Sequence, residues 1–268
     1  MQYIMPIRRD NSNKGDFGKI LNFSGSENYI GAAYLSSAAT LKIGAGLTAI
    51  ATTKNVINSI SNALPEAIYY TRSKGFENFN KFSVILIGCG LDTTKDSIKT
   101  LKKTLKNINP EKQNLVIDAD GLNILSNINT KLPNNSIITP HPLEASRLLG
   151  IPLEHVMENL IGAAKNLTEK YCCTTVLKTH HTIICNKNLE IHINNNENSA
   201  LAKAGTGDVL AGIISGLLAQ KMQPFEACKL GVHLHAVAGT IAAKKLTKYS
   251  VLASDILEYL PIAIKKYI

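Results

Sequence analysis

The chain has 268 residues, 45% of them hydrophobic, and a formal net charge of +9. We expect one domain spanning residues 1–268, without a membrane span of roughly 18 apolar residues and without a signal peptide. The five cysteines lack metal-ligand spacing and favour a reducing cytoplasm. The lysines are dispersed and form no basic patch interleaved with aromatic residues, so we expect no nucleic-acid partner; phosphorylated small ligands explain a basic surface equally well.

Short apolar runs alternate with longer helical patterns along the chain. The predicted strands cover residues 20–23, 47–51, 84–87, 115–117, 137–139, 175–177 and 182–185. The predicted helices cover residues 32–43, 97–106, 143–149, 156–170, 209–220, 224–245 and 253–266. This alternation predicts an α/β fold with a mostly parallel central sheet and helices on both faces. Ligands of such sheets bind beyond the carboxyl ends of the strands.

A Gly-Cys-Gly turn follows the predicted strand that ends at Ile87. Gly88 and Gly90 permit close approach of the backbone to a ligand, although any tight turn would use them as well. Small residues in segments 24–26 and 31–33 leave a similar choice between helix packing and contact with a flat ligand.

Two aspartates follow the apolar strand that ends at Ile117. Asp118 and Asp120 point to one side if the strand continues, where they could hold Mg²⁺ through water or contact a ribose. The alternative is a turn in which Asp120 is a helix N-cap. The sequence leaves both interpretations open.

A stiff Thr-Pro-His-Pro turn follows the strand that ends at Thr139. The two prolines flank His141, and Glu144 follows in the first turn of the predicted helix. His141 is either a solvent-exposed turn residue or a ligand contact, and Glu144 suits the positive end of a helix dipole.

The strongest motif is a Gly-Thr-Gly-Asp segment that leads into a helix with a strongly apolar face. Backbone N–H groups of Gly205, Thr206 and Gly207 can approach an anion at the helix N-terminus. Asp208 either caps this helix or is a base that faces a substrate hydroxyl.

This motif resembles the anion hole and catalytic base of ribokinase-like kinases. The chain also contains Thr139–Pro142 and, in the same order as the nucleotide-dependent NAD(P)H-hydrate dehydratase family, segments from Lys14–Gly18 to His235–Gly239. In this combination the chain resembles that family, and the resemblance covers most of its length. The resemblance implies a ribokinase-like fold and a carbon–oxygen lyase that repairs hydrated NADH or NADPH with ADP or, alternatively, ATP. In the implied reaction, the hydroxyl group on the hydrated ring of the cofactor is phosphorylated, and phosphate is then lost. Mg²⁺ is an expected cofactor.

The resemblance also implies roles for individual residues. Asp208 takes the hydroxyl proton, and the backbone of Gly205–Gly207 stabilises the moving phosphoryl group. The residues matched to the hydrated cofactor are Ala32, Gly90, His141 and Asp208. The residues matched to the adenine nucleotide are Lys178, Thr179, His180, His181 and Thr182, together with Gly205, Thr206 and Gly207. We assign no metal-ligating side chain and expect no epimerase domain.

The chain departs from the family pattern in two places. The family commonly has Gly-Pro-Gly-Leu-Gly where this chain has Gly88–Asp92, so Cys89 replaces the proline and Asp92 replaces the last glycine. Thr179 stands where the family has the glycine of Lys-Gly. These departures leave the substrate contact and the nucleotide preference open. Adjacent His180 and His181 on a strand would point to opposite faces, so we do not expect them to share a metal ion.

Two other functions fit parts of the same pattern. A ribokinase-like kinase of a small vitamin precursor would share Gly205–Asp208 without requiring Thr139–Pro142. A non-catalytic nucleotide-binding regulator would explain the departures, but it would not need Asp208 as a base. For the dehydratase we expect a cytoplasmic homo-oligomer, such as a tetramer.

Overall fold

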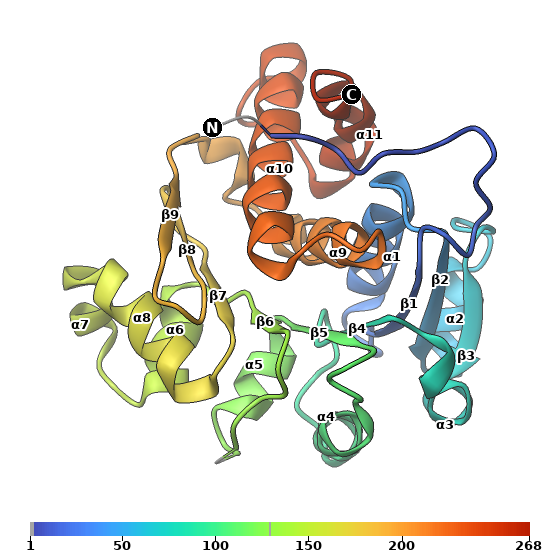
Figure 1. The fold of residues 1–268 in the computed structure, drawn as a ribbon, viewed down its shortest axis with the longest axis horizontal. Coiled ribbons are helices and arrows are strands. Elements are labelled where there is room, and N and C mark those ends of the chain that lie inside the picture. Colours follow the sequence, from blue (N-terminus) through green and yellow to red (C-terminus); the bar gives the residue numbers. More distant parts are fainter. Residues whose placement is uncertain (1–2, 129) are drawn as a thin grey trace.

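The computed structural model describes residues 3–128 and 130–268. Nine strands in these ranges form one sheet in the order β3-β2-β1-β4-β5-β6-β7-β8-β9 (Figure 1). Neighbouring strands are parallel as far as β7, and β8 runs antiparallel to both β7 and β9. The strands are β1 (Lys19–Phe23), β2 (Leu47–Thr52), β3 (Ile68–Thr71), β4 (Val84–Ile87), β5 (Asn114–Ile117), β6 (Ser136–Ile138), β7 (Thr174–Leu177), β8 (Thr182–Cys185) and β9 (Ile191–Asn194). The mostly parallel α/β fold is therefore confirmed.

Helices cover both faces of this sheet. In Figure 1, α1, α9, α10 and α11 lie above the central strands, and α4, α5, α6 and α8 lie below them. The helices are α1 (Ile30–Lys42), α2 (Lys54–Ile60), α3 (Arg72–Glu77), α4 (Lys95–Asn107), α5 (Asp120–Leu125), α6 (Pro142–Leu149), α7 (Leu153–Glu158), α8 (Leu160–Tyr171), α9 (Thr206–Ala219), α10 (Pro224–Leu246) and α11 (Ala253–Ile264), with short 3₁₀ turns η1 (Phe79–Lys81) and η2 (Ser199–Leu201).

Alternate side chains of each central strand enter different cores. On β1, Ile20 packs with the core beneath α9 and α10, whereas Leu21 packs with the core on the opposite face. On β4, Leu86 and Ile87 divide in the same way. Because both faces are buried, these strands are continuous apolar runs, which made them recognisable from sequence.

The prediction of one continuous helix over residues 156–170 was wrong. The structure has α7 and α8 there, separated at Asn159. Asn159 adopts a non-helical conformation, and its side-chain oxygen accepts a 2.8 Å hydrogen bond from the Gly162 N–H. This cap starts a new helix, because it satisfies a backbone donor that has no partner within the helix.

Helices α1 and α9 approach each other closely through glycines. A β-carbon at Gly212 of α9 would lie 2.2 Å from the Ser36 carbonyl oxygen of α1, and one at Gly216 would lie 2.1 Å from Ile43. Glycine is therefore required for this spacing between the helices.

We expect Gly212→Ala to lower the free energy of unfolding by about 1–3 kcal/mol, because the added methyl group overpacks a buried contact. The matched control is Gly31→Ala in α1, where a β-carbon has no neighbouring atom within 4 Å. That change should raise stability by about 0.5–1 kcal/mol, because alanine favours helix. Urea unfolding of both variants measures the difference, and equal effects would contradict the close helix contact.

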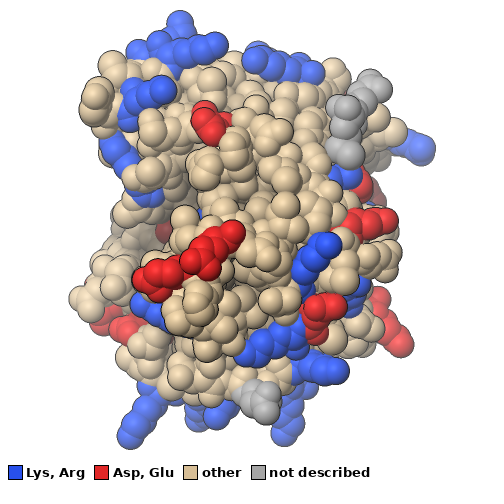
Figure 2. All heavy atoms as spheres, turned by 90° about the vertical axis from the view of Figure 1, so that its left-hand side faces the viewer, with Lys and Arg blue, Asp and Glu red and all other residues tan. Residues whose placement is uncertain are grey.

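Figure 2 shows the charged side chains on one face of the molecule. On the face drawn in Figure 2, Lys and Arg lie mostly towards the upper and lower ends, and Asp and Glu lie mostly between them. Among residues 3–128 and 130–268, no helix is both long enough and apolar enough to cross a bilayer.

Candidate functional site

The central parallel strands end at one edge of the sheet and carry the site there. Asp118 directly follows β5, Thr139 follows β6 and Lys178 follows β7, and these three strands are neighbours in the sheet. Since parallel strands share the direction of their carboxyl ends, residues far apart in sequence meet at this edge.

A buried ion pair forms the centre of this edge. The Lys178 Nζ lies 2.6 Å from the Asp118 Oδ1, and the Thr139 hydroxyl donates a 2.7 Å hydrogen bond to the same oxygen. Burial alone would lower the pKa of Lys178, but the charges of Asp118 and Glu144 raise it above the ordinary value. Lys178 is therefore a fixed positive charge at this edge.

Asp208 lies beside this ion pair, in the first turn of α9. Burial, reinforced by the negative charge of Asp118, raises its pKa to about 7. Gly205 is the N-cap of α9 and no side chain caps the helix, so the interpretation of Asp208 as the cap is wrong. A carboxylate with a pKa near neutrality is suited to accept and release a proton.

The raised pKa of Asp208 predicts a pH-dependent difference in stability. A carboxyl whose pKa is raised on folding favours the folded state fully below its unfolded pKa, near 4, and this contribution is lost as pH rises towards 7. Relative to the wild-type chain, Asp208→Asn should therefore gain stability between pH 4 and 7, reaching on the order of 4 kcal/mol. Thermal unfolding at pH 5 and pH 8 measures this gain, and a pH-independent difference would contradict it.

The loop before α9 is held by its own residues. Gly205 has φ +87°, a left-handed conformation, and a β-carbon there would lie 2.6 Å from Leu35. The Thr206 hydroxyl donates to the carbonyls of Leu201 and Lys203. The buried His235 ring lies 2.9 Å from the Thr206 carbonyl through Nε2, and burial lowers its pKa to about 4. The neutral ring donates this hydrogen bond and fixes the loop.

Gly207 faces the ion pair from the start of α9. A β-carbon on Gly207 would lie 3.5 Å from the Lys178 Nζ and 3.9 Å from an Asp118 carboxylate oxygen. The missing side chain thus leaves a small space between the helix N-terminus and Lys178. Such a helix end, with a lysine opposite, provides positive potential for an anion.

His141 and Glu144 form a reciprocal cap at the start of α6. The Glu144 N–H donates to the His141 Nδ1 at 3.3 Å, and the His141 N–H donates to the Glu144 carboxylate at 2.8 Å. Burial raises the pKa of Glu144 to about 7, although the nearby Lys178 opposes the shift. Burial and Lys178 lower the pKa of His141, which is neutral at physiological pH and half exposed.

Gly90 and Ala32 lie in contact. A β-carbon at Gly90, where φ is +58°, would lie 2.7 Å from the Ala32 β-carbon. Asp92, two residues later, also has a left-handed φ of +66°. Aspartate tolerates this conformation better than most residues, so it preserves the backbone that glycine would adopt.

The two aspartates after β5 have different partners. The strand ends at Ile117, and the Asp118 carboxylate forms its ion pair with Lys178. Asp120 is the first residue of α5, where Ala119 is the N-cap, and its carboxylate accepts a 2.8 Å hydrogen bond from the Asp92 N–H. The assignment of Asp120 as an N-cap is therefore wrong.

A cavity of about 810 Å³ opens beside this edge. Most of the predicted nucleotide-binding residues line it, namely Lys178, Thr179, His180, Thr182, Thr206 and Gly207, and so does His141. His181, Gly205, Asp208, Ala32 and Gly90 are not among its lining residues. The cavity thus unites the predicted nucleotide segment with Gly207, whereas Ala32 and Gly90 form a separate contact.

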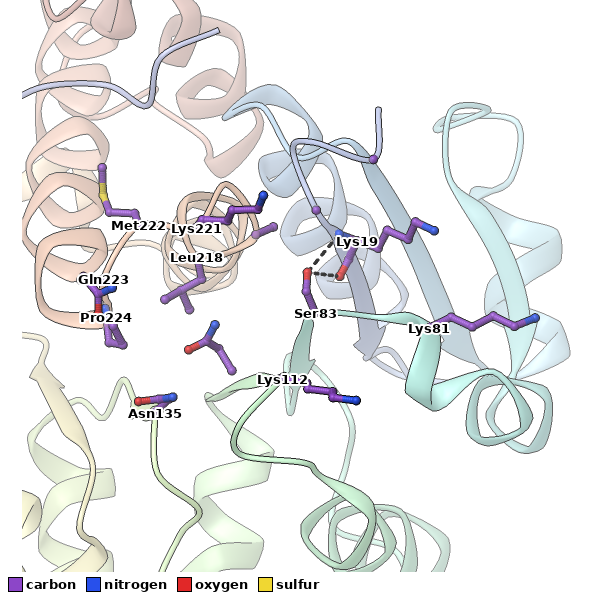
Figure 3. Close-up of a pocket in the computed structure, with 14 residues that line it drawn as sticks. Lys19, Lys81, Ser83, Lys112, Asn135, Leu218, Lys221, Met222, Gln223 and Pro224 are labelled. Atoms are coloured by element: carbon purple, nitrogen blue, oxygen red, sulfur yellow. Dashed lines mark hydrogen bonds between the residues drawn. The ribbon is translucent and has the colours of Figure 1, made fainter. Parts of the chain in front are cut away.

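A second cavity, of about 460 Å³, lies away from these residues (Figure 3). It is lined near the amino ends of the strands by Lys19, Ser83 and Asn114, and near the start of α10 by Pro224. None of the predicted site residues lines it, so we place the site at the carboxyl edge.

The expectation that His180 and His181 point to opposite faces was wrong. Strand β7 ends at Leu177 and β8 begins at Thr182, so both histidines lie in the intervening turn rather than on a strand. Their ring centroids are 4.5 Å apart. Thr179 needs no glycine conformation, since its φ is not positive, and its hydroxyl donates to the His181 carbonyl at 2.7 Å.

Sequence reasoning missed several residues of the site. His235 lies in the apolar helix α10, 29 residues after Thr206, and the local sequence gave no sign of its bond to the Thr206 carbonyl. Asn194, Asn196 and Asn198, from an asparagine-rich segment, also line the cavity. The position of this segment directly before Gly205–Asp208 was the available signal.

Comparison with known proteins identifies the family and the fold of the chain. The sequence pattern of the NAD(P)H-hydrate dehydratase family matches residues 20–262. An Enterococcus faecalis protein named ADP-dependent (S)-NAD(P)H-hydrate dehydratase is 33% identical, over 100% of this chain and 91% of its own length. Other curated matches are bifunctional NAD(P)H-hydrate repair enzymes, and the chain spans about half the length of those.

Two solved structures share the whole architecture. A ribokinase-like superfamily protein from Enterococcus faecalis superposes with a TM-score of 0.90 at 33% identity, covering 98% of this chain and 92% of the other. An ADP/ATP-dependent NAD(P)H-hydrate dehydratase from Bacillus subtilis, co-crystallised with ATP and Mg²⁺, gives a TM-score of 0.88 at 29% identity, covering 99% and 95%. The fold is therefore ribokinase-like, and the chain belongs to the NAD(P)H-hydrate dehydratase family.

Proposed function

We propose that this protein dehydrates (6S)-NAD(P)H hydrate at the expense of ADP, restoring NADH or NADPH and releasing AMP and phosphate. The observation that carries the proposal is the juxtaposition of Asp208, whose pKa is about 7, with the start of α9 and the Lys178–Asp118 ion pair. Such an arrangement supplies a base, backbone donors and a fixed cation around one small space. ATP, which would yield ADP and phosphate, is the alternative donor.

In this proposal Asp208 accepts the proton of the substrate ring hydroxyl. The hydroxyl oxygen forms a bond to the terminal phosphorus of ADP while the bond between that phosphorus and the bridging oxygen of AMP breaks. The backbone N–H groups of Gly205–Gly207 and the Lys178 ammonium offset the charge of the moving phosphoryl group. Phosphate then leaves the ring carbon that carried the hydroxyl, and the neighbouring ring carbon loses a proton to solvent, which restores the ring double bond.

The nucleotide would occupy the 810 Å³ cavity. Its lining by the turn over residues 178–182 and by the start of α9 supports this placement. The names of the relatives support the nucleotide, since one is called ADP-dependent and the other ADP/ATP-dependent.

Mg²⁺ would offset the phosphate charge when bound with the nucleotide. Mg²⁺ binds carboxylate oxygens. One carboxylate oxygen of Asp118, one of Asp208 and the Cys89 Sγ all lie within 4.8 Å of one another. Asp118 is the better candidate to contact a hydrated ion, since Asp208 is assigned to the proton.

We propose that the chain is a single domain, that it works in the cytoplasm and that it assembles as a homo-oligomer, such as a tetramer. The single nine-stranded sheet supports one domain, and the five cysteines, which are all unpaired, support a reducing compartment. Light scattering of the purified chain measures the assembly, and a monomer would contradict it.

The test of function is turnover of hydrated NADH and of hydrated NADPH with Mg²⁺, with ADP and ATP tried separately. We expect recovery of the reduced-nicotinamide absorbance and release of one phosphate per cofactor restored. A stable phosphorylated product from a vitamin precursor, without free phosphate, would instead establish the small-molecule kinase. Nucleotide binding without turnover of any of these substrates would establish the non-catalytic regulator.

A further inference from the structure

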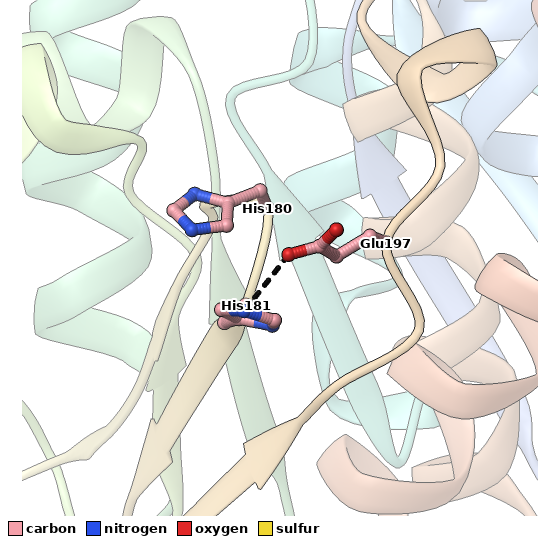
Figure 4. Close-up of side chains that lie close together, drawn as sticks. All are labelled: His180, His181 and Glu197. Atoms are coloured by element: carbon pink, nitrogen blue, oxygen red, sulfur yellow. Dashed lines mark ion pairs between the residues drawn. The ribbon is translucent and has the colours of Figure 1, made fainter.

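Two segments at the mouth of the cavity bring nitrogen and oxygen ligands together. His180 and His181 belong to the turn between β7 and β8, and Glu197 belongs to the segment between β9 and η2. Figure 4 shows the Glu197 carboxylate reaching toward the two imidazole rings from the facing segment. The His181 Nε2 lies 2.9 Å from the Glu197 Oε1, and one ligand atom from each of the three residues lies within 4.8 Å of the others.

The turn itself keeps the two rings on one side. The Thr179 hydroxyl donates to the His181 carbonyl, and the Thr182 hydroxyl donates to the Thr179 carbonyl at 3.1 Å. These bonds hold a tight turn in which adjacent histidines do not alternate as they would on a strand. The backbone of the turn therefore brings the two rings close together, with their centroids 4.5 Å apart.

We propose that His180, His181 and Glu197 bind a divalent transition-metal ion of the zinc class. Imidazole nitrogens and a carboxylate oxygen bind Zn²⁺ at about 2.0–2.2 Å, so neighbouring ligand atoms of a tetrahedral site lie about 3.3 Å apart. The His181–Glu197 pair is already within this separation, and His180 is exposed and free to rotate inward. Mg²⁺ is disfavoured there, because it prefers oxygen ligands.

The location gives the ion a structural consequence. His180 and Glu197 both line the 810 Å³ cavity, and they belong to two segments that face each other in Figure 4. An ion held by all three residues would fasten the β7–β8 turn to the segment over residues 195–198. The site is separate from Asp208 and does not rest on the proposed reaction.

The test is titration of the untagged, metal-free chain with Zn²⁺ by calorimetry, without nucleotide. We expect one ion per chain, bound at least about tenfold more weakly by each of His180→Ala, His181→Ala and Glu197→Gln. The matched control is His155→Ala, which removes an exposed histidine from α7 and should leave the affinity unchanged. Absence of binding, or equal binding by all four variants, would overturn the proposal.

Cobalt distinguishes this site from the group formed by Cys89, Asp118 and Asp208. Co²⁺ bound by nitrogen and oxygen gives only weak visible bands, whereas a cysteine ligand adds an intense thiolate-to-cobalt charge-transfer band. For the wild-type chain we expect only the weak visible bands, without the charge-transfer band. We expect these weak bands to be lost in His180→Ala. A thiolate band that persists in His180→Ala would place the ion at Cys89 and overturn the assignment. These readouts do not depend on whether the chain turns over hydrated cofactor.

Discussion

Asp208→Asn is expected to reduce turnover of hydrated NADH by about 10³-fold while nucleotide binding is retained. The amide is close in size to the carboxylate, but it cannot accept the hydroxyl proton. Steady-state turnover and nucleotide titration of the same preparation measure the two effects. In the wild-type chain, kcat/KM should rise with pH up to about 7, where Asp208 becomes ionised, and this limb should be absent from the residual activity of the variant.

The matched control is Asp120→Asn. Asp120 is also a carboxylate near the edge of the sheet, but it accepts a hydrogen bond from the Asp92 N–H, which an amide oxygen can equally accept. Its turnover should therefore change little. Full activity in Asp208→Asn would remove this residue from the proton transfer.

Lys178→Met is expected to have the second-largest effect, on both stability and turnover. Asp118 is almost completely buried, so removing its cationic partner leaves an uncompensated charge and should cost about 3 kcal/mol of unfolding free energy. Turnover should fall about 100-fold, because the lysine also offsets the phosphoryl charge in the proposed reaction. Urea unfolding and the dehydratase assay measure the two losses.

The double variant Lys178→Met/Asp118→Asn separates these two roles. Removing the second charge should restore most of the lost stability, since no unpaired carboxylate remains. Turnover should remain low, because the cation at the phosphoryl position is still missing and the carboxylate proposed to contact the hydrated Mg²⁺ is now missing as well. Recovery of turnover in the double variant would show that Lys178 acts only as the partner of Asp118.

The parts of the site that sequence predicted are those with a local signature. The segment Gly205–Asp208 was recognisable because its glycines precede an apolar helix, and the structure places it at that helix start. The central strands were recognisable because they are buried on both faces. The edge strands β3 and β9 were missed, because their burial is incomplete and their apolar pattern is short.

The parts that sequence did not predict depend on contacts between distant segments. Nothing near Glu144 in sequence indicates that Lys178 will lie beside it or that burial will raise its pKa to about 7. The predicted strands over residues 175–177 and 182–185 already left His180 and His181 in the turn between β7 and β8, and the alternation rule of a strand was nevertheless applied to them. A prediction that assumed a continuing strand therefore reversed their geometry.

The glycine-mediated contact between α1 and α9 has a consequence for how this site can adapt to its ligands. Ala32 belongs to α1 and Asp208 belongs to α9. Gly212 and Gly216 allow these two helices to pack in close contact. The two helices therefore form a rigid platform, on which substrate contact and proton acceptor keep a fixed spacing. Adjustment to ligands of different length must then come from the facing wall, where the β7–β8 turn and residues 195–198 border the cavity.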